Sequence, residues 1–221
     1  MGRFDVVKVK NSSSENIKND IPENLPSKFS FTSIVAKRLS GKTNLICWLI
    51  QNHLYNKYDE ILILSPTCKV DPTWNSISRF KNVYFLDDVS PDDLAMIFEI
   101  QRQRSKKGKT LLLVLDDYGN ESKFIPVLEK LACTGRHWKM SVIVTVQQFK
   151  LLSSVIRNNT KNWLIGKMNK KEQDKVFEEL SALIDESTLR DQYLNITSKP
   201  FAFLNINENR PSKLLSRNFD P

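Results

Sequence analysis

The chain has 221 residues, of which 40% are hydrophobic and 10% aromatic, so it can bury the core of one ordinary to large domain. Its 33 Lys and Arg against 25 Asp and Glu give a formal net charge of +8, which favours a polyanionic partner such as nucleic acid. Three cysteines, an odd number, do not indicate a disulfide framework, and with two histidines far apart they do not form a zinc site. No apolar run reaches membrane-spanning length. We therefore expect a soluble, intracellular protein without membrane insertion.

The two ends of the chain are polar. Residues 1–28 are predicted to be a flexible N-terminal arm, because the stretch 11–27 carries two prolines and lacks hydrophobic periodicity. Residues 207–221 are polar and basic and are predicted to be a C-terminal tail. The folded domain is therefore expected over 29–206.

Within that domain, short apolar runs alternate with helical patterns. The runs predicted to be strands are 29–36, 60–65, 83–86, 111–115, 141–146, 162–166 and 200–206. Helical patterns between them include 43–54, 91–104 and 171–184. Strands that are apolar on both faces lie between two helical layers, so the sequence predicts an α/β three-layer sandwich with a mainly parallel central sheet.

The stretch AKRLSGKT, residues 36–43, joins the first predicted strand to the first helix. In this context backbone N–H groups at a helix start bind phosphates, a lysine neutralises them and a hydroxyl ligates magnesium, which are the roles we assign to Lys42 and Thr43. Ala36 stands where such a loop has its first glycine, and its Cβ would cost about 1 kcal/mol if the backbone φ were positive. The residues predicted to contact the nucleotide are Ala36, Lys37, Arg38, Leu39, Ser40, Gly41, Lys42, Thr43 and Asn44.

Two adjacent acids, Asp116 and Asp117, end the predicted strand 111–115. A nucleotide hydrolase needs one carboxylate that supports magnesium and a second group that orients or deprotonates water. We therefore predict that Asp116 joins Thr43 as a metal-supporting residue and that Asp117 acts on water. The alternative is that both acids merely end a strand at a turn.

The basic run 102–109 precedes the same strand, at the end of the sheet opposite the predicted nucleotide. Its charges are expected to solubilise a loop, with contact to a DNA backbone as the alternative. Lys167, Lys170, Lys171 and Lys175 form a second candidate patch for DNA.

Further features lie downstream of the paired acids. They are Gly135-Arg136-His137, an apolar strand ending at Gln147, Leu152, and Ile156-Arg157-Asn158, together with ILILSPTCKVDPTW at 61–74. With these features the stretch of about 29–167 resembles the FtsK/HerA superfamily of P-loop DNA-pumping ATPases. It is most similar to the poxvirus-type genome-packaging ATPases of large DNA viruses and their virophages.

The resemblance assigns roles to three more residues. Gln147 resembles the polar sensor that contacts the γ-phosphate or the attacking water. Arg136 and Arg157 are candidates for an arginine finger that reaches the nucleotide of a neighbouring subunit. From the residues alone, Gln147 could instead cap its strand and either arginine could be a surface ion-pair partner, so the choice between them stays open.

The resemblance implies an additional-strand P-loop NTPase that forms a homo-oligomeric ring and uses ATP with Mg²⁺ to pump double-stranded DNA into a viral capsid. Capsid proteins are implied as further partners, and the viral factory of the host cytoplasm and the virion as locations. A positive, sequence-indifferent surface suits a motor that moves along the phosphate backbone.

Two other classes of function compete with this interpretation. A P-loop kinase does not need the paired acids, and a GTPase should carry Asn-Lys-x-Asp, whereas the stretch beginning at Asn169 has Glu172 in place of the aspartate. A non-catalytic DNA-binding or capsid-binding scaffold with a degenerate loop is favoured by Ala36 and disfavoured by the two carboxylates, Gln147 and the arginines.

Overall fold

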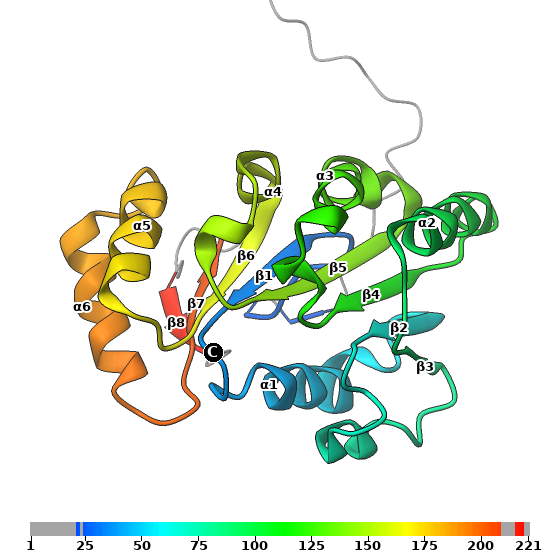
Figure 1. The fold of residues 1–221 in the computed structure, drawn as a ribbon, viewed down its shortest axis with the longest axis horizontal. Helices are drawn as coiled ribbons and strands as arrows, with labels where there is room; N and C mark the ends of the chain where they lie inside the picture. The colour runs from blue at the N-terminus through cyan, green and yellow to red at the C-terminus, as the bar shows by residue number, and fades with distance from the viewer. Residues whose placement is uncertain (1–20, 23, 209–214, 219–221) are drawn as a thin grey trace, which may run out of the picture.

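The computed structural model describes residues 21–22, 24–208 and 215–218, and these residues form an eight-stranded sheet with helices on both faces (Figure 1). The strands are β1 (Phe31–Val35), β2 (Glu60–Leu64), β3 (Val83–Leu86), β4 (Leu111–Leu115), β5 (Met140–Val146), β6 (Thr160–Ile165), β7 (Leu204–Asn207) and β8 (Leu215–Arg217). The α-helices are α1 (Lys42–Leu49), α2 (Pro91–Ser105), α3 (Ile125–Thr134), α4 (Ser154–Asn159), α5 (Lys170–Leu180) and α6 (Glu186–Thr197). Shorter helical turns are η1 (Ile50–Leu54), η2 (Pro72–Ser76), η3 (Tyr118–Asn120), η4 (Ser122–Phe124), η5 (Gly135–Trp138) and η6 (Phe149–Leu151).

The sheet has the order β3-β2-β4-β5-β1-β6-β7-β8. Its first six strands in that order run parallel, and β7 and β8 add an antiparallel edge. β1 lies in the middle, between β5 and β6, so the loop that follows it emerges beside the carboxyl ends of its parallel neighbours. In open sheets of this kind ligands bind at those ends. The predicted fold class is confirmed.

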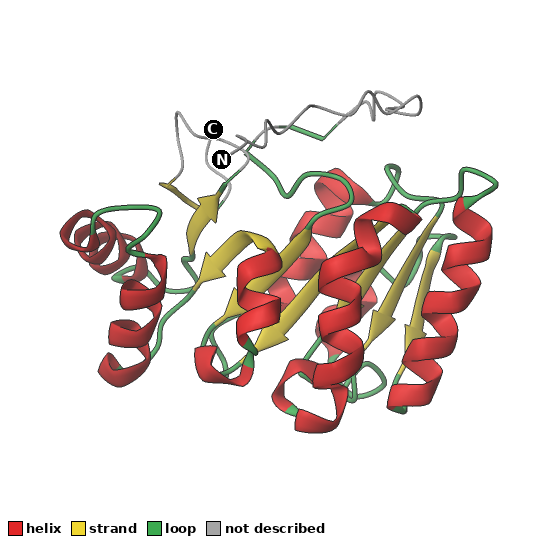
Figure 2. Cartoon of the chain, turned by 90° about the horizontal axis from the view of Figure 1, so that it is seen from above, coloured by secondary structure: helices red, strands yellow, loops and turns green. Residues whose placement is uncertain are grey.

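The two faces of the sheet have separate cores, which explains why its central strands are apolar on both sides. One core packs α2 to α6 onto alternate strand residues such as Leu113 and Val144. The other packs α1 and η2 onto the residues between them, such as Val114 and Ile143. The resulting three layers are visible in Figures 1 and 2.

The predicted N-terminal arm is too long. Residues 1–20 lie outside the described part of the chain, but Ile21 and Leu25 are buried in the core on the α1 face. Their backbone is held as well, because Asn207 Nδ2 donates to the Leu25 carbonyl at 3.3 Å. Two buried apolar side chains in a polar, proline-spaced stretch carry no periodicity, which is why the pattern missed them.

The predicted C-terminal tail also contains a strand. β8 pairs antiparallel with β7, with Leu204 opposite Arg217, and the following Asn218 side chain accepts from the Phe203 backbone N–H at 2.8 Å. A strand of three half-buried residues is too short to give a period-two signal.

No helix in the described ranges is long and apolar enough to cross a membrane.

Candidate nucleotide-binding site

The loop between β1 and α1 surrounds the start of the helix. Gly41 precedes α1 with φ 85°, in the left-handed region that glycine tolerates, and Leu39 also has a positive φ of 61°. Ala36 is fully buried and is not among the described residues with positive φ, so the penalty considered for its Cβ does not arise. Space for that Cβ comes from Gly166, where an added Cβ would lie 2.7 Å from the Ala36 Cβ. The missing loop glycine is thus matched by a glycine after β6.

The loop lines a cleft of about 610 Å³, a size typical of ligand pockets. The predicted contacts from Arg38 to Asn44 line it, whereas Ala36 lies in the core and Lys37 faces a neighbouring hollow. The opposite wall comes from the segment after β2 and includes Thr67, Val70, Asp71 and Thr73. Asp116 and Asp117 also line this cleft. Loop and paired acids, far apart in sequence, therefore share one site.

Lys42 is buried, and its Nζ donates to the carbonyl oxygens of Ala36 at 3.2 Å and Lys37 at 3.5 Å. Burial lowers the pKa of this ammonium, although the nearby carboxylates of Asp117 and Asp116 partly oppose the shift. A cation that is desolvated and held by neutral carbonyls gains from an anionic ligand, so the electrostatics favour phosphate binding here.

Asp116 is 3% exposed and is surrounded by hydroxyl groups. Its Oδ1 accepts from Thr145 Oγ1 at 2.9 Å, and its Oδ2 accepts from Thr43 Oγ1 and from Ser65 Oγ, each at 3.4 Å. Burial and the neighbouring Asp117 raise its pKa to about 6. Ser65 and Thr145 are not among the site residues predicted from the sequence. The sequence signal that could have identified them is a polar residue near the carboxyl end of an apolar run. Ser65 ends the run 60–65, Thr145 lies near the end of the run 141–146, and these two strands flank β4 in the sheet.

Thr43 and Asp116 provide a donor set suited to magnesium. Mg²⁺ prefers oxygen ligands and is held in proteins by one or two carboxylates, with water and substrate phosphates completing the shell. The hydroxyl and the carboxylate lie within hydrogen-bond distance of each other at the cleft, and both are oxygen donors. Among the described residues, no three or more His, Cys, Asp or Glu side chains are gathered closely enough to hold a metal ion by themselves.

Asp117 and Gln147 are joined through a residue that sequence reasoning missed, Asn120. Asn120 Nδ2 donates to Asp117 Oδ1 at 3.1 Å, and Asn120 Oδ1 accepts from the Gln147 backbone N–H at 2.9 Å. The Asp117 backbone N–H donates to Thr145 Oγ1 at 2.8 Å. The backbone of Asp117 has a φ of 64°, in the left-handed region. The residue predicted to act on water and the predicted sensor therefore lie on one hydrogen-bonded chain at the carboxyl ends of β4 and β5.

The two candidate arginines lie outside the lining of the cleft, in different segments of the chain. Arg157 in α4 donates to the Leu152 carbonyl at 2.6 Å, in the connection between β5 and α4, and to Glu179 at 2.8 Å. Arg136 is exposed in η5, just before β5 begins. Within one chain, Arg136 therefore lies at the end of β5 opposite Gln147.

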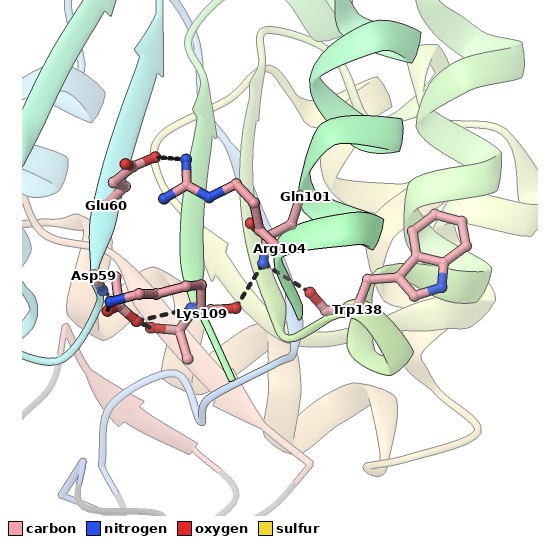
Figure 3. Close-up of polar contacts among 7 residues, drawn as sticks. Asp59, Glu60, Gln101, Arg104, Lys109 and Trp138 are labelled. Atoms are coloured by element: carbon pink, nitrogen blue, oxygen red, sulfur yellow. Dashed lines mark hydrogen bonds and ion pairs between the residues drawn. The ribbon is translucent and has the colours of Figure 1, made fainter. Parts of the chain in front are cut away.

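The basic run 102–109 lies at the amino ends of β2 and β4, opposite the cleft, and Arg102, Arg104 and Lys109 of this run are ion-paired. Figure 3 shows Arg104 bound to Glu60 at 2.6 Å and Lys109 bound to Asp59 at 2.7 Å. Burial opposes ionisation of Asp59, but Lys109 and the Thr110 donors outweigh it and lower the pKa to about 2.

The stretch that superficially resembles a guanine-binding motif has a structural role. The Asn169 side chain caps α5 by accepting from the Glu172 backbone N–H at 2.9 Å. The Glu172 carboxylate is buried and accepts from the Phe149 backbone N–H at 2.8 Å. Glu172 thus fastens η6 to α5.

The parallel sheet, the loop at its centre and the paired acids define a P-loop NTPase fold with additional strands. The sequence matches the family described as "Poxvirus A32 protein" over residues 23–199, and the chain belongs to this family. None of the curated proteins matches the chain.

Several solved structures share the fold. The genome packaging NTPase B204 from Sulfolobus turreted icosahedral virus 2, in complex with sulfate, has a TM-score of 0.62 and 16% identity over 85% of this chain and 95% of its own. The same protein with ATP-gammaS has a TM-score of 0.61 and 15% identity over 85% and 95%. EssC from Geobacillus thermodenitrificans, ATPases 2 and 3, has a TM-score of 0.50 and 14% identity over 67% of this chain and 34% of its own. At these identities the likeness establishes the shared fold.

The raised pKa of Asp116 predicts a pH-dependent effect of Asp116→Asn on the nucleotide-free protein without divalent cations. Above pH about 6 Asp116 is ionised in the folded protein, and this buried charge destabilises the fold. The destabilisation decreases as the pH falls and vanishes below the ordinary pKa of 3.8, where the carboxyl is protonated in both the folded and the unfolded protein. At pH 8 the free energy of unfolding of the variant should therefore exceed that of wild type by up to about 3 kcal/mol, so the variant should unfold at higher temperature. The difference in stability between the two proteins should narrow toward pH 5. Thermal melts across this range measure it. A variant less stable than wild type at pH 8 would contradict the assignment.

Proposed function

We propose that this protein is an ATP-driven translocase that packages double-stranded viral DNA into a capsid and works as a homo-oligomeric ring. The observation that carries the proposal is the gathering of Lys42, Thr43, Asp116 and Asp117 in one cleft. Membership of the poxvirus A32 family and the fold shared with a viral genome packaging NTPase support it. The net charge of +8 suits a DNA backbone partner, and capsid proteins are proposed as further partners.

Each residue has a task in the proposed reaction. Lys42 and the backbone N–H groups at the start of α1 bind and orient the triphosphate. Thr43 and Asp116 would hold Mg²⁺, which when bound neutralises charge on the phosphate oxygens. Asp117 orients a water and accepts its proton as the water oxygen attacks the γ-phosphorus and the bond to the β-phosphate oxygen breaks, leaving ADP and phosphate. Gln147, whose backbone N–H is bound by Asn120, contacts the γ-phosphate or that water.

Steady-state phosphate release with and without long double-stranded DNA tests the proposal, with Lys42→Ala as the paired variant. We expect hydrolysis of ATP by wild type, stimulation by DNA that weakens as salt rises, and background rates for Lys42→Ala. Because a trans arginine would make activity depend on assembly, the rates are measured over a range of protein concentrations.

Other outcomes would favour the competing functions. If wild type and Lys42→Ala both stay at background at every protein concentration, a scaffold that binds DNA or capsid protein replaces the motor. Hydrolysis of GTP in preference to ATP, without a response to DNA, would place the protein among other P-loop NTPases.

A further inference from the structure

Phe201 is an exposed aromatic residue at the edge of the P-loop cleft. It lies in the segment between α6 and β7, and because β7 runs antiparallel to β6, this segment reaches the end of the sheet where α1 begins (Figure 1). The ring packs on the loop glycine, since a Cβ added to Gly41 would lie 2.9 Å from Phe201 Cδ1. Phe201 therefore touches the backbone that precedes Lys42.

The fold gives this side chain little reason to be aromatic. Phe201 is 69% exposed as a residue, whereas the neighbouring Phe203 is 1% exposed. Its backbone has a φ of 56°, in the left-handed region that non-glycine residues rarely occupy and that costs about 1–3 kcal/mol. A strained residue with an exposed ring at the edge of a ligand cleft is better explained by a ligand than by packing.

The surroundings of the ring indicate the chemistry of that ligand. Phe201 lines the cleft and also an adjoining hollow of about 230 Å³, so both spaces meet at its ring. The hollow is bordered by the exposed Leu39, by hydroxyl-bearing Ser40, and by Lys37, Lys167 and Lys199. An apolar platform among hydroxyl and ammonium donors suits a flat, heteroaromatic group with polar edges.

We propose that Phe201 stacks against the nucleobase of the nucleotide whose phosphates bind at Lys42, with the base lying over the hollow beside Leu39. The inference rests on the proposed function, because it takes the cleft to be a nucleotide site. Stacking on an aromatic ring strengthens binding of any base, since every base has a π-face. Phe201 thus holds the base, and the loop holds the phosphates.

Two ligands separate these contributions in calorimetric titrations, namely ATP and inorganic tripolyphosphate, which lacks the base. Phe201→Leu keeps an apolar side chain against Gly41 but lacks the π-face, and Phe201→Tyr keeps the ring. We expect Phe201→Leu to weaken ATP binding about tenfold or more and to leave tripolyphosphate binding unchanged. Phe201→Tyr should stay close to wild type with both ligands. Tyr84→Ala, which removes an exposed ring from the distant edge strand β3, serves as the matched control.

The alternative outcomes are distinct. Unchanged ATP binding by Phe201→Leu overturns the base contact, and equal weakening of both ligands overturns it in favour of a role in supporting the loop. In either case wild type still binds both ligands and the proposed function stands. If wild type binds neither ligand, the proposed function fails and the base contact fails with it.

Discussion

Asp117→Asn is expected to lower the rate of ATP hydrolysis by a factor of about 10² to 10⁴ while leaving nucleotide binding close to that of wild type. The amide cannot accept a proton from water, but its oxygen can still accept the bond from Asn120 that fixes the side chain at 3.1 Å. Asparagine also tolerates the left-handed backbone at this position, where φ is 64°. Chemistry should therefore be lost without loss of the local fold.

Single-turnover phosphate release and a nucleotide titration measure the two halves of this prediction separately. Asn120→Ala is the informative companion, because it removes the bond that positions Asp117 but keeps the carboxylate. It should show a smaller rate loss than Asp117→Asn. Full activity in Asp117→Asn would show that Asp117 is not the base, and a matching loss of binding would make it a ligand-holding residue instead.

The features that sequence could predict are those carried by neighbouring residues. Strands such as 111–115, the helix start at Lys42 and the adjacent acids Asp116 and Asp117 are local patterns of hydrophobicity and residue type. Parallel α/β topology then follows, because few arrangements can bury strands that are apolar on both faces. The class of fold, and the loop and paired acids that share one cleft, could thus be predicted.

The rest depends on contacts between distant parts of the chain. Ser65 and Thr145 reach Asp116 only because β2 and β5 flank β4 in register. Phe201 meets the loop only because β7 runs antiparallel to its neighbour, and no spacing rule links position 201 to position 41.

Ala36, which stands where a phosphate-binding loop has its first glycine, shows the same limit of prediction from sequence. In the sequence Ala36 suggests a damaged loop, yet its Cβ occupies space that Gly166 leaves free at the end of the adjacent strand β6. A compensating pair of this kind can be recognised only when both positions are seen together. The backbone penalty that Ala36 suggests in the sequence is therefore absent from the structure.

Arg157→Ala is expected to reduce turnover about 10³-fold or more if Arg157 acts on the nucleotide of a neighbouring subunit, since a trans arginine stabilises charge in the transition state. Its guanidinium is held by the Leu152 carbonyl, in the connection that follows β5, while Arg136 precedes the start of that strand. Arg136→Ala should therefore have the smaller effect. Both variants are compared in steady-state hydrolysis at protein concentrations that allow assembly.

A mixing experiment separates action in trans from a structural role. Arg157 also packs over the Phe149 ring at 5.3 Å and bonds Glu179 at 2.8 Å, so its loss could disturb the subunit itself. Lys42→Ala subunits keep Arg157 but lack a working loop, whereas Arg157→Ala subunits keep the loop. If the arginine acts in trans, the mixture should regain activity that neither variant has alone, because each intact loop can then face an intact arginine. A mixture that stays at the sum of its two components would assign Arg157 to its own subunit, where Glu179 and the Leu152 carbonyl already engage its guanidinium.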